Sequence, residues 1–281
     1  MIIGVTLQIQ RLQVVGALLV PALLLLAGCG TPAGTPGAAS RHVFLIVMEN
    51  KSPDEALQGP FTASLASSYG VAADYRAVSH PSVPNYLALT SGQTWGIQDD
   101  SYHALPTKDL GTQLTAVGVT WRAYMDGMIA GCSDSPVPYD PGHNPFAFYG
   151  GACPSNVVPF TSFNGDLDGN TRMFSWISPD MCHDEHSCDV SVGDEWLRQT
   201  VGQIMKSKAW TENGALFITW DEDDGSSDNR VLTMVVTPNG GHHVSNRPYT
   251  HYSLLATIED LMGVGRLGNA AQATPMTDLV H

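Results

Sequence analysis

The chain has 281 residues and a formal net charge of −14, with 13 lysines and arginines against 27 aspartates and glutamates. This balance excludes a protein that binds nucleic acid through a basic surface. An acidic surface also repels anionic ligands, and a bound divalent cation would reverse the charge locally.

The N-terminus carries an export signal. Residues 14–27 form an apolar run after Arg11, too short to span a bilayer as a helix and suited to the core of a signal peptide. This run ends in Leu26-Ala27-Gly28-Cys29, which resembles a bacterial lipobox, in which cleavage precedes the cysteine and the cysteine carries lipid. An ordinary secretory signal or an uncleaved anchor is the alternative. We expect an exported, membrane-anchored lipoprotein that faces the extracytoplasmic side.

Three segments follow from this interpretation. Residues 1–28 are the predicted lipoprotein signal peptide, and residues 29–41 are the predicted lipidated Cys29 with a flexible tether rich in Gly, Pro, Ala and Ser. Residues 42–281 are long enough for one well-buried domain and short for two.

Four of the five cysteines remain once Cys29 is assigned to lipid. An oxidising compartment favours two disulfides, and we expect pairing within the two local clusters, Cys132 with Cys153 and Cys182 with Cys188. A zinc site that combines the second pair with His183 and His186 is the alternative, although the spacing lacks a paired C-x₂-C unit.

The domain alternates strand-like and helix-like segments, which favours an α/β fold. Strands are expected at residues 42–48, 119–124, 171–177, 215–220 and 231–237, and helices at residues 194–206 and 252–262, where the apolar spacing is helical. Residues 130–170 are dense in Gly, Pro, Asn and Asp and are expected to form a long surface excursion. The prediction is a single α/β domain with a central, mostly parallel sheet flanked by helices.

Two of the predicted strands end in oxygen ligands. The first runs into Glu49 and Asn50, and the strand at residues 215–220 runs into Asp221 and Glu222. Ligands in such sheets bind beyond the carboxyl ends of the strands, so both pairs are predicted to form one metal site.

A third segment, residues 79–92, places Ser82 and Asn85 at the expected start of a helix after a rigid turn with two prolines. A helix N-terminus offers free N–H groups to an anion such as phosphate. Plain helix capping is the alternative, since Ser and Asn are both favoured caps. The chain has no G-x-S-x-G motif, so a reactive serine here would need another activator, such as a metal ion.

Taken in order, residues 48–52 (Met-Glu-Asn-Lys-Ser), 79–86 (Ser-His-Pro-Ser-Val-Pro-Asn-Tyr) and 220–222 (Trp-Asp-Glu) resemble the phosphoesterase family that contains bacterial acid phosphatases and C-type phospholipases. That family is similar to the alkaline phosphatase superfamily, and the resemblance covers about residues 43–267. It implies an alkaline-phosphatase-like fold for the domain at residues 42–281.

The resemblance also implies roles for individual residues. In related nucleotide pyrophosphatases the nucleophilic threonine lies in a Thr-Phe-Pro-Asn turn, and residues 82–85 (Ser-Val-Pro-Asn) have the same form. Ser82 is thereby implied as the nucleophile and Asn85 as a phosphate contact. The implied metal ligands are Glu49, Asn50, Asp221 and Glu222, with Asn50 also a candidate substrate contact.

A second metal is implied by two-metal relatives, in which an Asp and two His hold the other ion. Asp184 and His186 are the candidates here, with a third ligand from His251, His243 or His242. A merely polar loop between Cys182 and Cys188 is the alternative. Oxygen ligands suit Mg²⁺, Ca²⁺ or Mn²⁺, whereas imidazoles shift the preference towards Zn²⁺ or Fe.

The other histidines carry weaker predictions. His80, beside the expected nucleophile, is predicted either to bond phosphate or protonate a leaving group, or to pack against Pro81. His103 and His143 have no evident partner and are expected to be solvated.

The function expected from these features is that of a metal-dependent, acid-phosphatase-like phosphoesterase that hydrolyses small phosphomonoesters through a phosphoserine. One alternative is a phospholipase C-like phosphodiesterase, for which residues 145–149 offer a candidate apolar surface. Another is a lipoprotein that binds phosphate or metal without turnover. The membrane would be reached through lipid on Cys29, and the sequence leaves the oligomeric state open.

Overall fold

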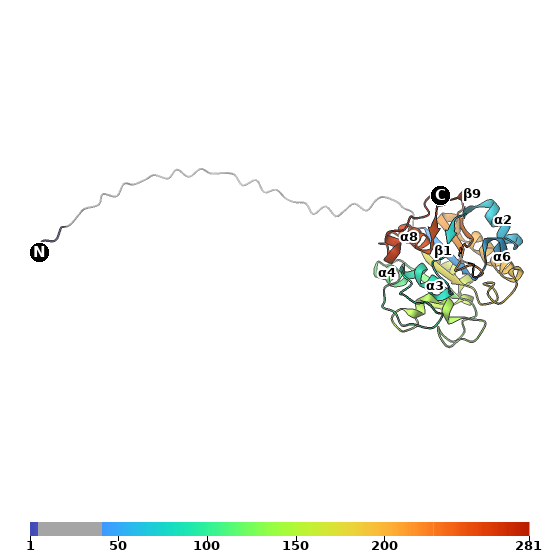
Figure 1. The fold of residues 1–281 in the computed structure, drawn as a ribbon, viewed down its shortest axis with the longest axis horizontal. Coiled ribbons are helices and arrows are strands. Elements are labelled where there is room, and N and C mark those ends of the chain that lie inside the picture. Colours follow the sequence, from blue (N-terminus) through green and yellow to red (C-terminus); the bar gives the residue numbers. More distant parts are fainter. Residues whose placement is uncertain (5–40, 227, 281) are drawn as a thin grey trace. The chain divides into compact units, whose positions relative to one another are not determined.

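The computed structural model describes residues 1–4, 41–226 and 228–280 (Figure 1). The predicted signal peptide and tether, including Cys29, therefore fall almost entirely outside the described residues. No helix in the described ranges has both the length and the apolar composition needed to cross a bilayer.

The domain is built on one eight-stranded sheet with the strand order β5-β4-β6-β1-β7-β8-β2-β9. Neighbours from β5 to β7 are parallel, β8 is antiparallel to both β7 and β2, and β9 is parallel to β2. In sheet order the strands are Val157–Pro159, Trp121–Met125, Phe174–Ser178, His42–Met48, Gly214–Trp220, Thr233–Val236, Gly70–Ala72 and His243–Ser245. A separate pair joins β3 (Tyr75–Arg76) to β10 (Tyr249–Thr250). The expected mostly parallel α/β sheet is confirmed.

The two central strands, β1 and β7, are covered on both faces. Val43 to Met48 in β1 and every residue of β7 are buried, which explains why both segments are apolar without alternation. These strands pair in parallel with Met48 opposite Trp220, so their carboxyl ends lie level at one edge of the sheet.

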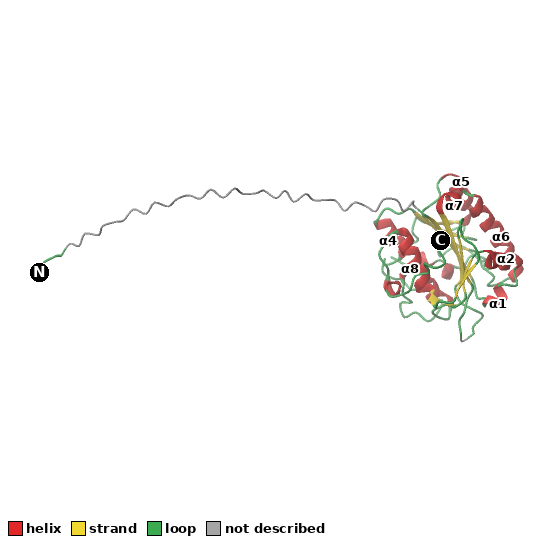
Figure 2. Ribbon diagram, turned by 90° about the horizontal axis from the view of Figure 1, so that it is seen from above, coloured by secondary structure: helices red, strands yellow, loops and turns green. Residues whose placement is uncertain are grey.

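Helices cover both faces of the sheet, as the edge-on view shows (Figure 2). One face carries α8 (His251–Met262) and α4 (Leu110–Ala116), with α3 (Ser82–Ser91) packed against both. The other face carries α1 (Pro53–Ala56), α2 (Pro60–Ser68), α5 (Phe163–Gly169), α6 (Val190–Lys206) and α7 (Lys208–Asn213). The helices expected at residues 194–206 and 252–262 are confirmed as parts of α6 and α8.

Residues 130–170 are more deeply packed than the predicted surface excursion. This segment includes β5, α5 and three short 3₁₀ helices, η1 (Pro141–His143), η2 (Pro145–Phe148) and η3 (Phe160–Ser162). Phe146, Phe148 and Phe163 are each at most 2% exposed. The prediction was wrong here because these aromatic side chains pack into the core although the backbone lacks regular periodicity.

Both predicted disulfides are confirmed, Cys132–Cys153 and Cys182–Cys188. The second closes a short loop, residues 180–188, that follows β6 and leads into α6. Because its sulfurs are joined to each other, the alternative zinc site at these cysteines is excluded.

Candidate active site

The carboxyl ends of β1 and β7 place two carboxylates next to each other. Glu49 follows Met48, Asp221 follows Trp220, and these preceding residues are partners in the sheet. The Asp221 N–H donates to the Met48 carbonyl at 2.9 Å, and the Glu49 N–H donates to the Asp184 carbonyl at 2.8 Å. Both side chains are fully buried, so the sheet register itself builds this acidic pair.

Ser82 comes to the same place from α3. Its Oγ lies 3.1 Å from Glu49 Oε2, 3.1 Å from Glu222 Oε1 and 3.4 Å from Asn50 Oδ1. Ser82 is the first residue of α3, with Pro81 as the N-cap residue. Three distant parts of the chain therefore converge on one hydroxyl group.

Asn50 completes the group through an unusual backbone conformation. Its φ of 44° is left-handed, a region that Asn tolerates better than most residues. The terminal atom of its side-chain amide that faces the carboxylates lies 2.7 Å from Glu49 Oε2 and 3.1 Å from Asp221 Oδ1. Either the amide NH₂ donates to the two carboxylates, or the amide oxygen and the carboxylates all face a cation.

The chemistry of these side chains fits a hard divalent cation. Glu49, Asp221 and Glu222 offer carboxylate oxygens here, and the amide of Asn50 carries one further oxygen that can serve as a ligand. Asp221 Oδ2 is buried without a hydrogen-bond partner among the described residues. Burial raises the pKa of Glu49 to about 8, and the charges of Asp184 and Glu222 raise it further. Burial also raises the pKa of Asp221, and the charges of Glu49 and Glu222 add to that rise. Buried carboxylates in such proximity must bind protons or a cation.

A buried histidine supports this group, contrary to the expectation of a solvated one. His143 is 6% exposed, and its ring stacks on Tyr86 with centroids 5.3 Å apart. Its Nδ1 lies 3.1 Å from Asp184 Oδ2 and its Nε2 lies 3.4 Å from Glu49 Oε1. Tyr86 also donates its hydroxyl proton to Glu49 Oε1. Burial would lower the pKa of His143, but Glu49 and Asp184 raise it to about 10.

The predicted second metal set is not assembled in this structure. Asp184 is buried and paired with His143, while the His186 side chain is exposed, its ring centroid 6.0 Å from that of His143. His251 is buried with Tyr75 on one ring nitrogen and the Asp221 carbonyl on the other.

The other two histidine candidates lie elsewhere. His242 Nδ1 contacts the Ala66 carbonyl at 3.1 Å, and His243 is an exposed residue of β9. The third ligand from His251, His243 or His242 stays a prediction, and the imidazole that contacts Asp184 in this structure belongs to His143.

Asn85 has a structural position rather than the predicted phosphate contact. Its Oδ1 accepts from the N–H groups of Val78 and Ser79, both at 3.0 Å, and its Nδ2 donates to the carbonyls of Ser79 and Pro81. These bonds fully engage the buried amide, so it shapes the turn before Ser82 and has no group left for a phosphate.

His80 contacts an acidic partner rather than only Pro81. Its Nδ1 bonds Glu222 Oε2, and its Nε2 lies 3.2 Å from the Ser226 carbonyl. The same carboxylate reaches Ser82 through its other oxygen, so His80 orients Glu222 towards the serine.

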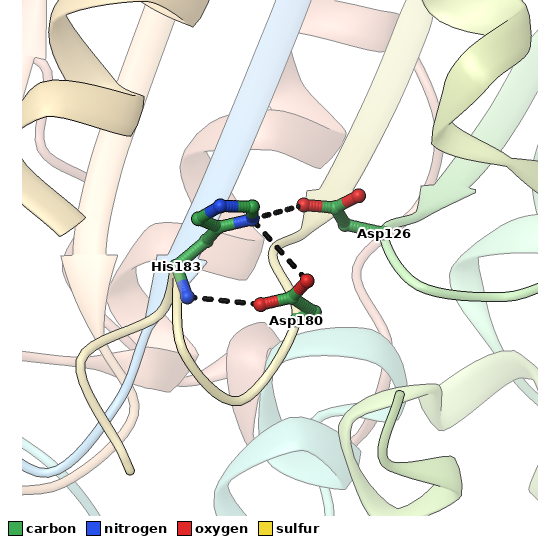
Figure 3. A group of neighbouring side chains, drawn as sticks. All are labelled: Asp126, Asp180 and His183. Carbon is green, nitrogen blue, oxygen red and sulfur yellow. Dashed lines mark hydrogen bonds and ion pairs between the residues drawn. The ribbon is translucent and has the colours of Figure 1, made fainter. Parts of the chain in front are cut away.

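The loop at residues 180–188 is anchored by a separate cluster of Asp126, Asp180 and His183 (Figure 3). His183 Nδ1 lies 2.7 Å from Asp126 Oδ2 and 3.3 Å from Asp180 Oδ2. Hydrogen bonds to Asp126 and Asp180 raise the pKa of His183 to about 10. A protonated imidazole shared by two carboxylates accounts for this cluster without an ion.

Comparison with known sequences identifies the family. A model of the Phosphoesterase family matches residues 55–265. The chain belongs to this family. The match confirms the resemblance inferred from the three sequence motifs, and it makes the protein a hydrolase that acts on phosphoric ester bonds.

Two curated proteins that are similar in sequence to this phosphoesterase are named as phosphatases. Phosphatidylinositol-3-phosphatase of Mycobacterium tuberculosis is 31% identical, over 96% of this chain and 94% of its own length. Phosphate-repressible acid phosphatase of Penicillium chrysogenum is 27% identical, over 83% of this chain and 61% of its own length. The present chain thus spans less than two thirds of the fungal enzyme.

Solved structures confirm the fold. A protein of the alkaline phosphatase superfamily from Vibrio parahaemolyticus superposes with a TM-score of 0.60 at 12% identity, covering 82% of this chain and 69% of that one. Murine ectonucleotide pyrophosphatase/phosphodiesterase 5, in complex with AMP, gives 0.59 at 9% identity, covering 83% and 99%. The phosphoesterase domain therefore has the predicted alkaline-phosphatase-like fold.

Proposed function

We propose that this phosphoesterase hydrolyses phosphomonoesters by transferring the phosphoryl group to Ser82, at a site that binds a divalent cation. The observation that carries the proposal is the Ser82 hydroxyl, which lies 3.1 Å from carboxylate oxygens of both Glu49 and Glu222. A hydroxyl facing carboxylates can lose its proton to one of them as it attacks phosphorus.

The cation would be held by Glu49, Asn50, Asp221 and Glu222. The Asn50 amide contacts carboxylate oxygens of Glu49 and Asp221, and Glu49 and Glu222 each place an oxygen 3.1 Å from Ser82 Oγ. A divalent ion there supplies positive charge that lowers the pKa of the serine hydroxyl and neutralises the phosphoryl oxygens. The nearby Lys51 does not supply this charge, because its Nζ donates to the carbonyls of Asn50 and Glu185.

The protein groups then have separate tasks in the two half-reactions. In the first, a bond forms between Ser82 Oγ and phosphorus, the bond to the leaving oxygen breaks, and the serine proton passes to a carboxylate. In the second, water attacks the phosphoserine, the Oγ–phosphorus bond breaks, and Ser82 regains a proton. His80 and Tyr86 keep Glu222 and Glu49 oriented throughout.

A monoester is favoured over a phospholipid diester. Phe146 and Phe148, within the segment considered as an apolar lipid-binding surface, are buried in the domain. The relative with 31% identity is named a phosphatidylinositol-3-phosphatase, which adds the phosphomonoesters of phosphoinositides to the candidate substrates. A binder without turnover would not need a serine hydroxyl placed between two carboxylates.

Export as a lipoprotein anchored through Cys29 belongs to the same proposal. It is supported by the lipobox-like sequence and by the two disulfides, which are typical of oxidising compartments. Cell fractionation tests it, since Cys29→Ser should release the protein from the membrane fraction, and unchanged membrane attachment would contradict lipidation.

Replacement of the serine tests the catalytic part. We expect Ser82→Ala to lower turnover of p-nitrophenyl phosphate by roughly 10³-fold or more while the thermal unfolding midpoint stays close to that of the wild type. Chelation should abolish wild-type turnover, and a single added divalent cation should restore it. Ser68→Ala is the control, because its hydroxyl is exposed on α2 and bonds only the Ser64 carbonyl. Wild-type turnover in Ser82→Ala would refute the nucleophile.

A further inference from the structure

The first turn of α3 has few N–H groups to offer a substrate. Pro84 has none, so the residues next to the hydroxyl that can donate outward are Ser82 and Val83. The Val83 N–H is the first backbone donor after the proposed nucleophile. It lies at the positive end of a ten-residue helix, the position at which a phosphoryl oxygen on Ser82 would be stabilised.

That donor is already engaged by an anion of the protein itself. The Val83 N–H donates to Asp100 Oδ1 at 3.0 Å. Val83 directly follows Ser82, whose Oγ lies 3.1 Å from carboxylate oxygens of both Glu49 and Glu222. Asp100 thus places a carboxylate oxygen at the N-terminal end of α3, on the N–H of the residue next to the proposed nucleophile.

The segment that carries Asp100 is held at its two ends and by the Tyr102 ring, whose centroid lies 5.3 Å from that of Phe148. The Ile97 N–H donates to the Thr94 carbonyl, and the Leu105 N–H donates to the Phe148 carbonyl at 2.7 Å. Between these points Asp99, Asp100, Ser101 and Tyr102 are exposed. The side-chain hydrogen bonds of Asp99 are local, to the Ser101 N–H and to His103. Asp100 can therefore leave Val83 without breaking the core.

Resting on the proposed role of Ser82, we propose that the Asp100 carboxylate occupies the position of a phosphoryl oxygen and must be displaced from the Val83 N–H when phosphate or a phosphomonoester binds. Asp100 is thereby a specificity-determining residue that weakens the binding of dianionic phosphate. It limits product retention, because the carboxylate returns to the N–H as inorganic phosphate leaves.

Binding of inorganic phosphate to the full-length protein tests this directly by calorimetry, with a divalent cation present. We expect Asp100→Ala to tighten the Kd for phosphate about tenfold, since a tenfold change corresponds to the loss of one competing contact of about 1.4 kcal/mol. Asp100→Asn should show a smaller effect, because its amide oxygen still accepts from Val83. The KM for p-nitrophenyl phosphate should also fall, more in Asp100→Ala than in Asp100→Asn.

Asp99→Asn is the matched control, because it removes the same charge from the same exposed segment without touching Val83. If Asp100→Ala left the Kd for phosphate unchanged or raised it, the proposal would be overturned and Asp100 would be only a cap of α3. If Asp99→Asn lowered the Kd for phosphate as much as Asp100→Ala, the proposal would also be overturned. Phosphate binding is measured without turnover, so this result stands apart from the test of Ser82 as the nucleophile.

Discussion

His143 contacts the carboxylate of Glu49, one of the proposed metal ligands, and orients it. Its two ring nitrogens face Asp184 and Glu49, and its ring lies flat on Tyr86, which bonds the same Glu49 oxygen. Partners that orient metal ligands in this way typically set metal affinity and reactivity as strongly as some ligands do. The imidazole is therefore expected to act through Glu49 rather than on the substrate.

Replacement of this histidine should reveal that indirect role. We expect His143→Asn to weaken divalent-cation binding and to lower kcat about 10- to 100-fold, with little change in the KM of p-nitrophenyl phosphate. Calorimetry with the metal alone and steady-state kinetics measure the two effects. His103→Asn serves as the control, because His103 is paired with Asp99 at the surface. Unaltered cation affinity together with unaltered kcat would show that His143 only packs.

The sequence predicts site residues well where position along an element decides the outcome. Glu49 and Asp221 were predicted to meet because each directly follows a buried parallel strand, and Ser82 because it begins a helix. His143 could not be predicted, since it lies in a short 3₁₀ helix whose burial depends on contacts with Tyr86 and Asp184.

At the scale of elements, long apolar segments were predictable and short ones were not. β1, β7, α6 and α8 are long and strongly patterned, whereas β2 and β9 have only three residues each and depend on their neighbours in the sheet. The packing of residues 130–170 was missed for the same reason. The aromatic side chains of this segment, part of which is closed by the Cys132–Cys153 disulfide, are buried although they do not recur at regular intervals along the sequence.

The helix α8 also carries an acidic residue whose burial makes stability depend on pH. Glu259 is fully buried, and its Oε1 accepts from the Leu267 N–H at 2.8 Å. Its Oε2 has no hydrogen-bond partner among the described residues. Burial raises its pKa from 4.5 to about 8. The folded state therefore retains a proton that the unfolded chain releases above pH 4.5, and the associated stability is lost as the pH rises towards 8.

Glu259→Gln should remove this dependence, because glutamine keeps the acceptor for Leu267 and cannot ionise. We expect the free energy of unfolding of the variant, relative to the wild type, to increase between about pH 5 and pH 8, with an upper limit of about 1.4 kcal/mol for each unit by which the pKa is raised. Urea unfolding at several pH values measures this difference. A difference that stays constant with pH would contradict a raised pKa at Glu259.

At the scale of the whole molecule, the net charge of −14 and the acidic group around Ser82 repel a phosphate ester, which is itself an anion. The fold resolves this by bringing the carboxylates of Glu49, Asp221 and Glu222 together in a buried group, where they suit a divalent cation.

Identification of the residue that becomes phosphorylated tests the central claim most directly. The full-length protein is mixed with p-nitrophenyl phosphate and a divalent cation, quenched in acid during turnover, digested and examined by mass spectrometry. We predict one phosphoryl group on the peptide that contains Ser82, and none on that peptide in Ser82→Ala. Phosphorylation of a different serine or threonine, or turnover with no phosphate on the Ser82 peptide, would contradict the proposed mechanism.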